Sequence, residues 1–343
     1  MSNLDFSLVF LFLLASQFSI KLYLAQRQIR HVVQHRNQVP LAFAQRISLE
    51  NHQRAADYTR AKVSTAMFEM LIQSMWLVLL TVGGLLSQIQ SILGSVWLML
   101  FPQDIPGTGL DFQVCLMMMV IMLGSLIDIP FSLWRQFVID QRFGFNRMTL
   151  GLWMSDQVKG MAISLIIGIP FLALVLWMMQ QTGQYWWLWV WAVWMLFQLA
   201  VMVIWPTWIA PMFNRFEPLQ EGDVKRAVES LLNRCGFSSQ GLFVMDGSKR
   251  SAHGNAYFTG MGKSKRIVFF DTLLAQLTPY EIEAVLAHEL GHFKHRHILK
   301  RIVLSAVFSF LALALLAWVM NQAWFYRGLG LIPLPGSQSA AAL

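Results

Sequence analysis

The feature that most limits the fold of this chain is a series of long apolar segments that contain almost no charge. A helix needs about twenty residues to cross a hydrocarbon layer of about 30 Å, and six segments reach that length. Hydrophobic residues make up 56% of the chain and charged residues only 13%, whereas soluble domains average roughly 45–50% and 25%. The sequence therefore predicts an α-helical polytopic membrane protein with six or more transmembrane helices. The six predicted spans are Phe6–Leu24, Met67–Leu86, Phe112–Leu133, Gly160–Met179, Trp186–Ile204 and Ile302–Met320.

Several details qualify this pattern. Ile92–Phe101 is apolar but too short to cross, so we expect it to lie in the interface or to line the protein. The first span lacks a basic leader and a clear cleavage site, which favours a retained helix over a signal peptide. Glu69 lies at a helix entrance, where its carboxylate is expected to reach the interface. Asp128 lies deeper and predicts either a polar contact between helices or the lining of a water-filled cavity.

The distribution of positive charge predicts the orientation of the helices in the membrane. All but one of the 26 Lys and Arg residues lie in three alternate connections, Lys21–Lys62, Arg135–Lys159 and Trp205–Arg301. The positive-inside rule places these connections in the cytoplasm and the N-terminus on the opposite side. The net charge of +8 is then a marker of sidedness, and no nucleic-acid partner is expected. Two cysteines cannot build a disulfide framework, which fits a reducing compartment.

The longest connection is patterned like a folded domain. A helix is predicted at Asp223–Arg234, and strands at Leu242–Met245, Asn255–Thr259 and Arg266–Asp271. A turn rich in glycine and charge, Gly260–Lys265, joins the last two strands into a hairpin. We therefore divide the chain into residues 1–204 with five transmembrane helices, residues 205–301 as a cytoplasmic α+β insert, and residues 302–343 with the sixth helix and the start of a seventh.

A further helix in the insert has a clear start signal. Thr278 is suited to the N-cap, Pro279 to the first helical position, and Glu281 completes a capping box three residues after Thr278. The helix then reaches His288-Glu289-Leu290-Gly291-His292, an H-E-x-x-H motif.

The spacing of this motif has a chemical reason. Residues four apart share a helix face, so His288 and His292 can offer imidazole nitrogens to one zinc ion. Glu289 is turned about 100° away, close enough to take a proton from a zinc-bound water as general base and pass it to the leaving amine. His295 is two turns from His288, about 10 Å along the axis, and is assigned to a solvated basic helix end.

Several blocks of sequence, in this order, resemble the type I CAAX prenyl protease family of integral-membrane zinc endopeptidases. The blocks are Ile129–Asn146, Pro211–Leu219, His253–Gly260, Phe269–Leu274 and Val285–Lys294.

The resemblance implies seven spans that enclose a large chamber, with the zinc site at its cytoplasmic end. It also implies His288 and His292 as zinc ligands, Glu289 as catalytic base, and an extended segment that binds substrate backbone as an added strand. An ordinary hairpin edge is the alternative for that segment. The segment consists of Asn255, Ala256, Tyr257 and Phe258.

One feature departs from the family. Its third zinc ligand is a glutamate on a later helix, whereas no Asp or Glu follows Glu289 in this sequence. A catalytic zinc needs three protein ligands and an open position. We expect either a substitute ligand, such as His253 or His295, or a chain that is shortened.

The leading functional hypothesis is a membrane-embedded zinc metalloendopeptidase that cleaves peptides at the cytoplasmic face. Its partners would be the bilayer and a peptide or protein substrate, either a prenylated CAAX-type C-terminus or a misfolded membrane protein. The alternative is a non-catalytic chamber that binds peptides or lipids and lacks the third ligand. A transporter is disfavoured because the sequence has no internal repeat and transport does not explain H-E-x-x-H.

Overall fold

The computed structural model describes residues 2–107, 109–237, 241–259 and 266–331. Within them, six helices are long and apolar enough to cross a membrane, which confirms the predicted α-helical polytopic class. The Gly260–Lys265 turn and the expected start of a seventh span lie outside the described residues. The six spanning segments are Asn3–Gln34, Leu49–Leu80, Leu110–Asp140, Leu150–Gln181, Gly183–Phe213 and His297–Val319.

Along the chain, long helices alternate with short elements as far as Phe213, and the strands of the described residues lie between Phe216 and Phe270. The α-helices are α1 (Asn3–Gln34), α2 (Leu49–Leu80), α3 (Leu85–Leu100), α4 (Leu110–Trp134), α5 (Leu150–Gln181), α6 (Trp186–Ile204), α7 (Ala210–Phe213), α8 (Asp223–Arg234), α9 (Asp271–Gln276), α10 (Pro279–Lys294), α11 (His297–Val319) and α12 (Ala323–Gly328). The strands are β1 (Phe216–Pro218), β2 (Leu242–Met245), β3 (Ala256–Thr259) and β4 (Arg266–Phe270). Short 3₁₀ or π turns are η1 (Leu41–Phe43), η2 (Arg135–Asp140), η3 (Gly183–Tyr185), η4 (Trp205–Ile209) and η5 (Gly247–Lys249).

The fold divides into two compact units. The first contains Met1–Phe143, Ile163–Trp186 and Leu315–Leu343, and the second contains Gly144–Ala162 and Trp187–Ala314.

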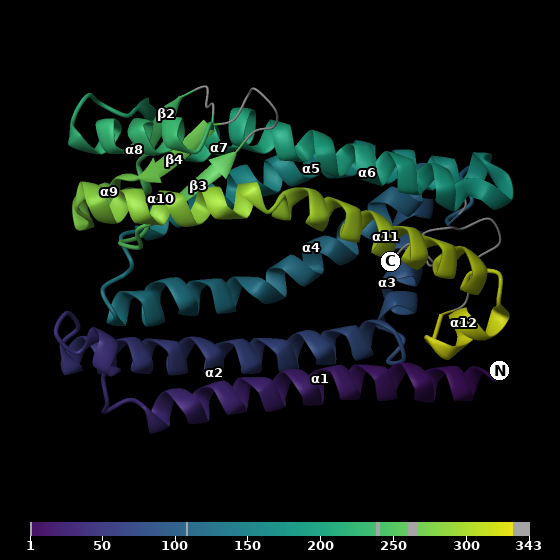
Figure 1. The fold of residues 1–343 in the computed structure, drawn as a ribbon. Coiled ribbons are helices and arrows are strands. Elements are labelled where there is room, and N and C mark those ends of the chain that lie inside the picture. Colours follow the sequence, from purple (N-terminus) through teal and green to yellow (C-terminus); the bar gives the residue numbers. More distant parts are fainter. Residues whose placement is uncertain (1, 108, 238–240, 260–265, 332–343) are drawn as a thin grey trace. The chain divides into compact units, whose positions relative to one another are not determined.

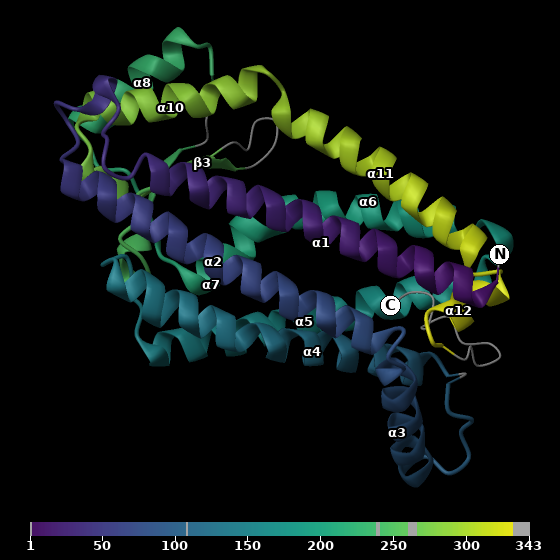
Figure 2. The ribbon, with the colours of Figure 1, turned by 90° about the horizontal axis from the view of Figure 1, so that it is seen from below.

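In the first unit, α1 and α2 run side by side in opposite directions (Figures 1 and 2). A bidentate ion pair closes their connection, since Arg36 donates from Nε and Nη2 to the two carboxylate oxygens of Asp57, each at 2.8 Å. No residue of α1 is fully buried, and several of its large apolar side chains, such as Phe12 and Leu13, are exposed. Such an exposed apolar face is what a helix in contact with lipid requires.

The second predicted span, Met67–Leu86, was wrong at its end. Helix α2 stops at Leu80, and Gly84 adopts a left-handed φ of 73° before α3 begins at Leu85. Glycine accepts this conformation without the steric cost of a side chain, so it breaks the apolar run into two helices. The short run Ile92–Phe101 falls at the end of α3, where Leu93 packs into a core with Phe112.

Both carboxylates in the predicted spans have partners in this unit. Gln73 donates to Asp128 at 3.2 Å, a polar contact between α2 and α4, which was one of the two predicted roles. Glu69 accepts a hydrogen bond from Arg135 at 2.8 Å, and its side chain is only 13% exposed. The ion pair, which the sequence analysis did not anticipate, therefore accounts for a charge at this position.

The second unit contains a four-stranded sheet of order β1-β2-β4-β3. Strands β3 and β4 pair antiparallel, with Tyr257 opposite Val268, which confirms the predicted hairpin pairing. Strand β2 pairs parallel with β4, and β1 pairs antiparallel with β2. The sequence analysis missed β1, because three residues that end in a proline are too short to show a period.

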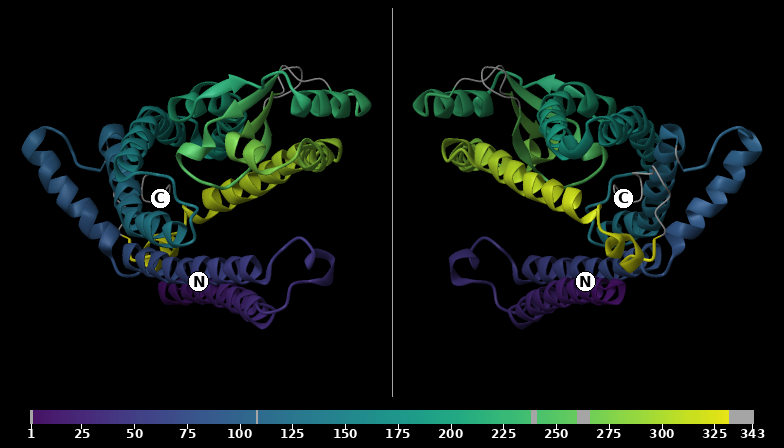
Figure 3. Two further views of the ribbon diagram at one scale, coloured as in Figure 1. Left: turned by 90° about the vertical axis from the view of Figure 1, so that its left-hand side faces the viewer. Right: turned by 90° about the vertical axis from the view of Figure 1, so that its right-hand side faces the viewer.

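One face of the sheet forms the core that positions the motif helix. Ile267 and Phe269 of β4 are fully buried there, together with Val228 of α8 and Ile282 and Leu286 of α10. Figure 3 shows the strands with these helices packed beside them. Each large aliphatic side chain in such a core contributes about 1.5–3 kcal/mol relative to exposure, so α10 is held firmly on the sheet.

Candidate metal centre

The helix that bears the motif begins as its sequence predicts. The backbone N–H of Thr278 donates to the Glu281 carboxylate at 2.9 Å, and the N–H of Glu281 donates to the Thr278 hydroxyl at 3.4 Å. This reciprocal pair is a capping box, and Pro279 occupies the first helical position. The start of α10 is thus fixed by local hydrogen bonds, which sets the rotation of every later residue about the helix axis.

The rotation of α10 separates its apolar side from its chemical side. Ile282, Leu286 and Leu290 follow at intervals of four residues and are buried against the sheet. His288 and His292 lie on the other side of the helix and are exposed. The same periodicity that buries the leucines therefore leaves both imidazoles accessible to a metal ion.

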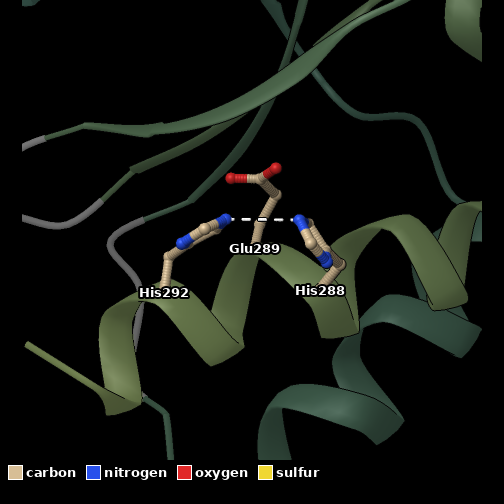
Figure 4. A group of neighbouring side chains, drawn as sticks. All are labelled: His288, Glu289 and His292. Carbon is tan, nitrogen blue, oxygen red and sulfur yellow. Dashed lines mark hydrogen bonds between the residues drawn. The ribbon is translucent and has the colours of Figure 1, made fainter. Parts of the chain in front are cut away.

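The two imidazoles converge. Their Nε2 atoms lie 3.2 Å apart, and their rings are perpendicular with centroids 4.8 Å apart (Figure 4). Two nitrogens that each lie about 2.0–2.1 Å from one tetrahedral zinc are about 3.3 Å apart. The pair His288 and His292 therefore already has the spacing that such an ion requires.

Glu289 completes the cluster. One ligand atom from each of His288, Glu289 and His292 lies within 4.8 Å of the others, and within the described ranges no other set of three such residues is found. Glu289 is half-buried, because its position on α10 falls between the apolar side and the histidine side. Figure 4 shows its carboxylate between the two imidazoles, beyond their ring nitrogens. This arrangement suits a base that acts on a water next to the metal.

The two histidines considered as substitute ligands lie elsewhere. His253 stacks on Phe145, with ring centroids 4.1 Å apart and planes at 17°. His295 stacks on His297 at 5.7 Å. Neither belongs to the metal-binding cluster of the described residues. His295 is exposed just after the end of α10, as the prediction of a basic helix end requires.

The segment expected to bind substrate lies at one edge of the sheet. Strand β3 holds Ala256, Tyr257 and Phe258, and Asn255 precedes it; the N–H of Phe270 donates to the carbonyl of Asn255 at 2.9 Å. The strand order places β3 at the edge, and α10 packs beside it. Burial raises the pKa of Tyr257 and keeps its phenol neutral. An edge strand offers backbone donors and acceptors on its outer side to an extended peptide.

The residues that anchor the chain just before β3 were missed by sequence reasoning. Arg250 makes a bidentate pair with Asp156, at 2.8 and 3.0 Å, and also donates to Asn214 at 2.8 Å. The N–H of Ala252 donates to the carbonyl of Phe145 at 2.9 Å. Both members of the ion pair are less than one-fifth exposed. No local pattern signals this network, since its partners are far apart in sequence.

The fold and the site together define a class. An apolar multi-helix chain with an H-E-x-x-H cluster beside the edge strand of a sheet has the architecture of a membrane-embedded metalloendopeptidase. The chain belongs to the CAAX prenyl protease family within peptidase family M48. Residues 28–215 match the model described as CAAX prenyl protease N-terminal, five membrane helices, and residues 218–340 match the model of peptidase family M48.

Individual relatives agree with this assignment. CAAX prenyl protease 1 of Saccharomyces cerevisiae is 33% identical over 96% of this chain and 72% of its own length. The Arabidopsis thaliana homologue is 40% identical over 60% of this chain and 49% of its own length. The crystal structure of Ste24p from S. mikatae superposes with a TM-score of 0.82 at 31% identity, covering 95% of this chain and 73% of that one. The chain thus spans between about half and three-quarters of these relatives.

Proposed function

We propose that this protein is a zinc metalloendopeptidase that hydrolyses peptide bonds in membrane-associated or CAAX-type proteins. The supporting observation is the convergence of His288, Glu289 and His292 on a rigidly packed helix next to the edge strand β3. The relatives that match this chain are named CAAX prenyl proteases, which suggests the substrate class.

In this proposal His288 and His292 supply two of the three protein ligands that a catalytic zinc needs, and Glu289 moves the proton. When bound, zinc polarises a scissile carbonyl and lowers the pKa of a neighbouring water. Glu289 takes a proton from the attacking water and later donates it to the leaving amine. His288 and His292 need their Nε2 lone pairs for the metal, and these atoms already face each other at 3.2 Å.

The substrate is positioned by β3. An extended peptide adds to the outer edge of the strand through backbone hydrogen bonds along Asn255, Ala256, Tyr257 and Phe258. The order β1-β2-β4-β3 supports this placement, because it leaves that edge of the sheet without a neighbouring strand among the described residues. Arg250, just before β3 in the chain, is anchored to Asp156 by two hydrogen bonds, which keeps this edge strand in place.

The orientation in the membrane follows from charge. We propose that residues 205–301 form the cytoplasmic peptidase insert between transmembrane residues 1–204 and 302–343. The alternating distribution of basic residues supports this placement, with the N-terminus on the opposite side. Lipidated protein termini at the cytoplasmic face are then the natural partners.

The test is hydrolysis by the purified chain in detergent, with a farnesylated CAAX peptide and its unprenylated form as substrates. Glu289→Gln should keep the zinc content and lower kcat by about 10²–10⁴-fold, because it removes only the base. Glu283→Gln, at a half-buried position six residues earlier on α10, serves as the matched control. Equal hydrolysis by the wild type and Glu289→Gln would exclude the proposed mechanism. Zinc binding without hydrolysis in the wild type would favour the non-catalytic chamber.

A further inference from the structure

The junction between α10 and α11 is unusually abrupt. The N–H of His295 makes the last bond of the α10 pattern, to Gly291 at 3.0 Å, and the N–H of Lys300 bonds to Arg296 at 3.0 Å in the first turn of α11. Arg296 has a φ of 54°, and no other non-glycine residue in the described part of the chain has a positive φ. A left-handed residue with a side chain costs roughly 1–2 kcal/mol. Contacts elsewhere must therefore favour this bend.

The bend brings one more histidine back to the motif. In a continuous helix, His297 would lie about 7.5 Å beyond His292 along the axis and about 140° away around it. In the structure, Nδ1 of His297 is 2.8 Å from Nδ1 of His292, and the ring centroids are 5.1 Å apart. The left-handed turn at Arg296 thus converts a distant residue into a hydrogen-bond partner of a motif histidine.

The two nitrogens of His292 face different neighbours. Its Nε2 faces Nε2 of His288, whereas its Nδ1 faces His297. A nitrogen that binds a metal must present a lone pair, so the proton of a neutral ligand imidazole resides on the other nitrogen. If Nε2 of His292 holds the metal, Nδ1–H must therefore find an acceptor, and Nδ1 of His297 is the atom that the structure places there.

We propose that His297 is a positioning residue whose Nδ1 accepts a hydrogen bond from Nδ1–H of His292 and so keeps His292 Nε2 directed at the metal. This inference rests on the proposed function, since it assumes that His288 and His292 hold zinc. His297 is not itself a ligand of the same ion, because it contacts the side of the His292 ring that is turned away from His288. The stacked ring of His295 supports His297 from the side.

The experiment measures zinc affinity of the purified chain in detergent by competition with a chelating dye. His297→Phe keeps a ring and removes the acceptor, so the zinc Kd should rise about 10–100-fold, as for other partners of metal-bound histidines. His297→Asn places Oδ1 near the position of the lost Nδ1, and its Kd should stay within about threefold of the wild type. His295→Phe is the matched control, because His295 contacts His297 but not the motif histidines, and it should bind zinc like the wild type.

The outcomes separate the inference from the proposed function. A wild type without stoichiometric zinc would overturn the metal site and this inference with it. An unchanged Kd in His297→Phe, with normal zinc in the wild type, would overturn only the role of His297. An equal loss in His297→Phe and His297→Asn would also overturn it, because the acceptor would not be what matters. Melting temperatures of the metal-free variants show whether a loss of zinc affinity comes from unfolding. If His297→Phe is destabilised, the zinc Kd of His297→Asn decides whether the acceptor at this position matters.

Discussion

Two histidine pairs with the same spacing lie on helices of this protein, and within the described residues only one belongs to a cluster that could hold a metal ion. His31 and His35 on and just after α1 are four residues apart, like His288 and His292 on α10, and their ring centroids are even closer, 4.3 against 4.8 Å. A third histidine lies near each pair, His52 near the first and His297 near the second. Spacing and proximity therefore do not distinguish the two sets.

The difference lies in what the ring nitrogens face. Nδ1 of His35 bonds to the carbonyl of His31 at 2.8 Å, and Nε2 of His52 bonds to the carbonyl of His35 at 2.9 Å. Both of these rings are thus engaged by the carbonyls at the end of α1, where His35 is the C-cap. On α10 the Nε2 atoms face each other and a carboxylate lies beside them. A metal site requires nitrogen lone pairs that converge on one point. The last carbonyls of a helix instead need hydrogen-bond donors, so the rings of His35 and His52 are bonded to carbonyls at the end of α1.

The largest expected effect concerns the ligands themselves. His292→Ala should reduce bound zinc from about one ion per chain to almost none, because one of the two converging nitrogens is lost. His35→Ala, the corresponding change in the α1 pair, should leave the zinc content unchanged. Metal analysis of the purified chains checks both. Equal zinc content in His292→Ala and the wild type would show that the α10 pair does not bind zinc, and so does not differ from the α1 pair.

The next effect concerns the packing that orients the α10 pair. Leu286 is fully buried between α10 and the sheet, and Leu286→Ala should lower the free energy of unfolding by about 2–5 kcal/mol. Chemical denaturation in detergent measures this loss. Leu304→Ala on α11, where the side chain is 57% exposed, is the control and should change stability by less than about 0.5 kcal/mol. Similar losses in the two variants would mean that the core beneath the motif does not hold α10.

The smallest expected effect tests whether an H-E-x-x-H sequence alone creates a zinc site. Val32→Glu converts the α1 pair into His31-Glu-Val33-Gln34-His35, a complete H-E-x-x-H. We expect no gain in bound zinc when this change is made in the His292→Ala background, because Nδ1 of His35 stays bonded to the carbonyl of His31. Metal analysis again provides the measurement. Recovery of one zinc would show that the motif alone creates the site.

Much of the fold and part of the site were predictable because the signals are local. Apolar segments with almost no charge define the spanning helices, and Thr278, Pro279 and Glu281 define the start of α10. The antiparallel pairing of β3 and β4 follows from two strand-like runs that are adjacent in the sequence. In each case the hydrogen bonds or the periodicity involve residues close in sequence, so a short stretch of sequence is enough to predict the element.

Other features could not be predicted because their causes are distant in sequence. Asp156 pairs with Arg250 across 94 residues, and β1 exists only because β2 offers it an edge. A single glycine pair, Gly83 and Gly84, looked compatible with a continuous span, whereas the core around Leu86 and Phe112 favours a second helix. Packing decides such cases, since a helix-propensity cost of about 1 kcal/mol per glycine can be overridden by tertiary contacts.

The sequence by itself determined that the chain crosses a membrane, how its positive charge alternates, and which helix bears the H-E-x-x-H motif. Only the tertiary structure decided which nitrogens converge, that β3 is the last strand in the order of the described sheet, and that His297 contacts His292. The physical reason is the same in each case. Helical periodicity fixes which side of α10 a residue occupies, but the left-handed turn at Arg296 and the burial of Leu286 depend on contacts that form only when the second unit packs.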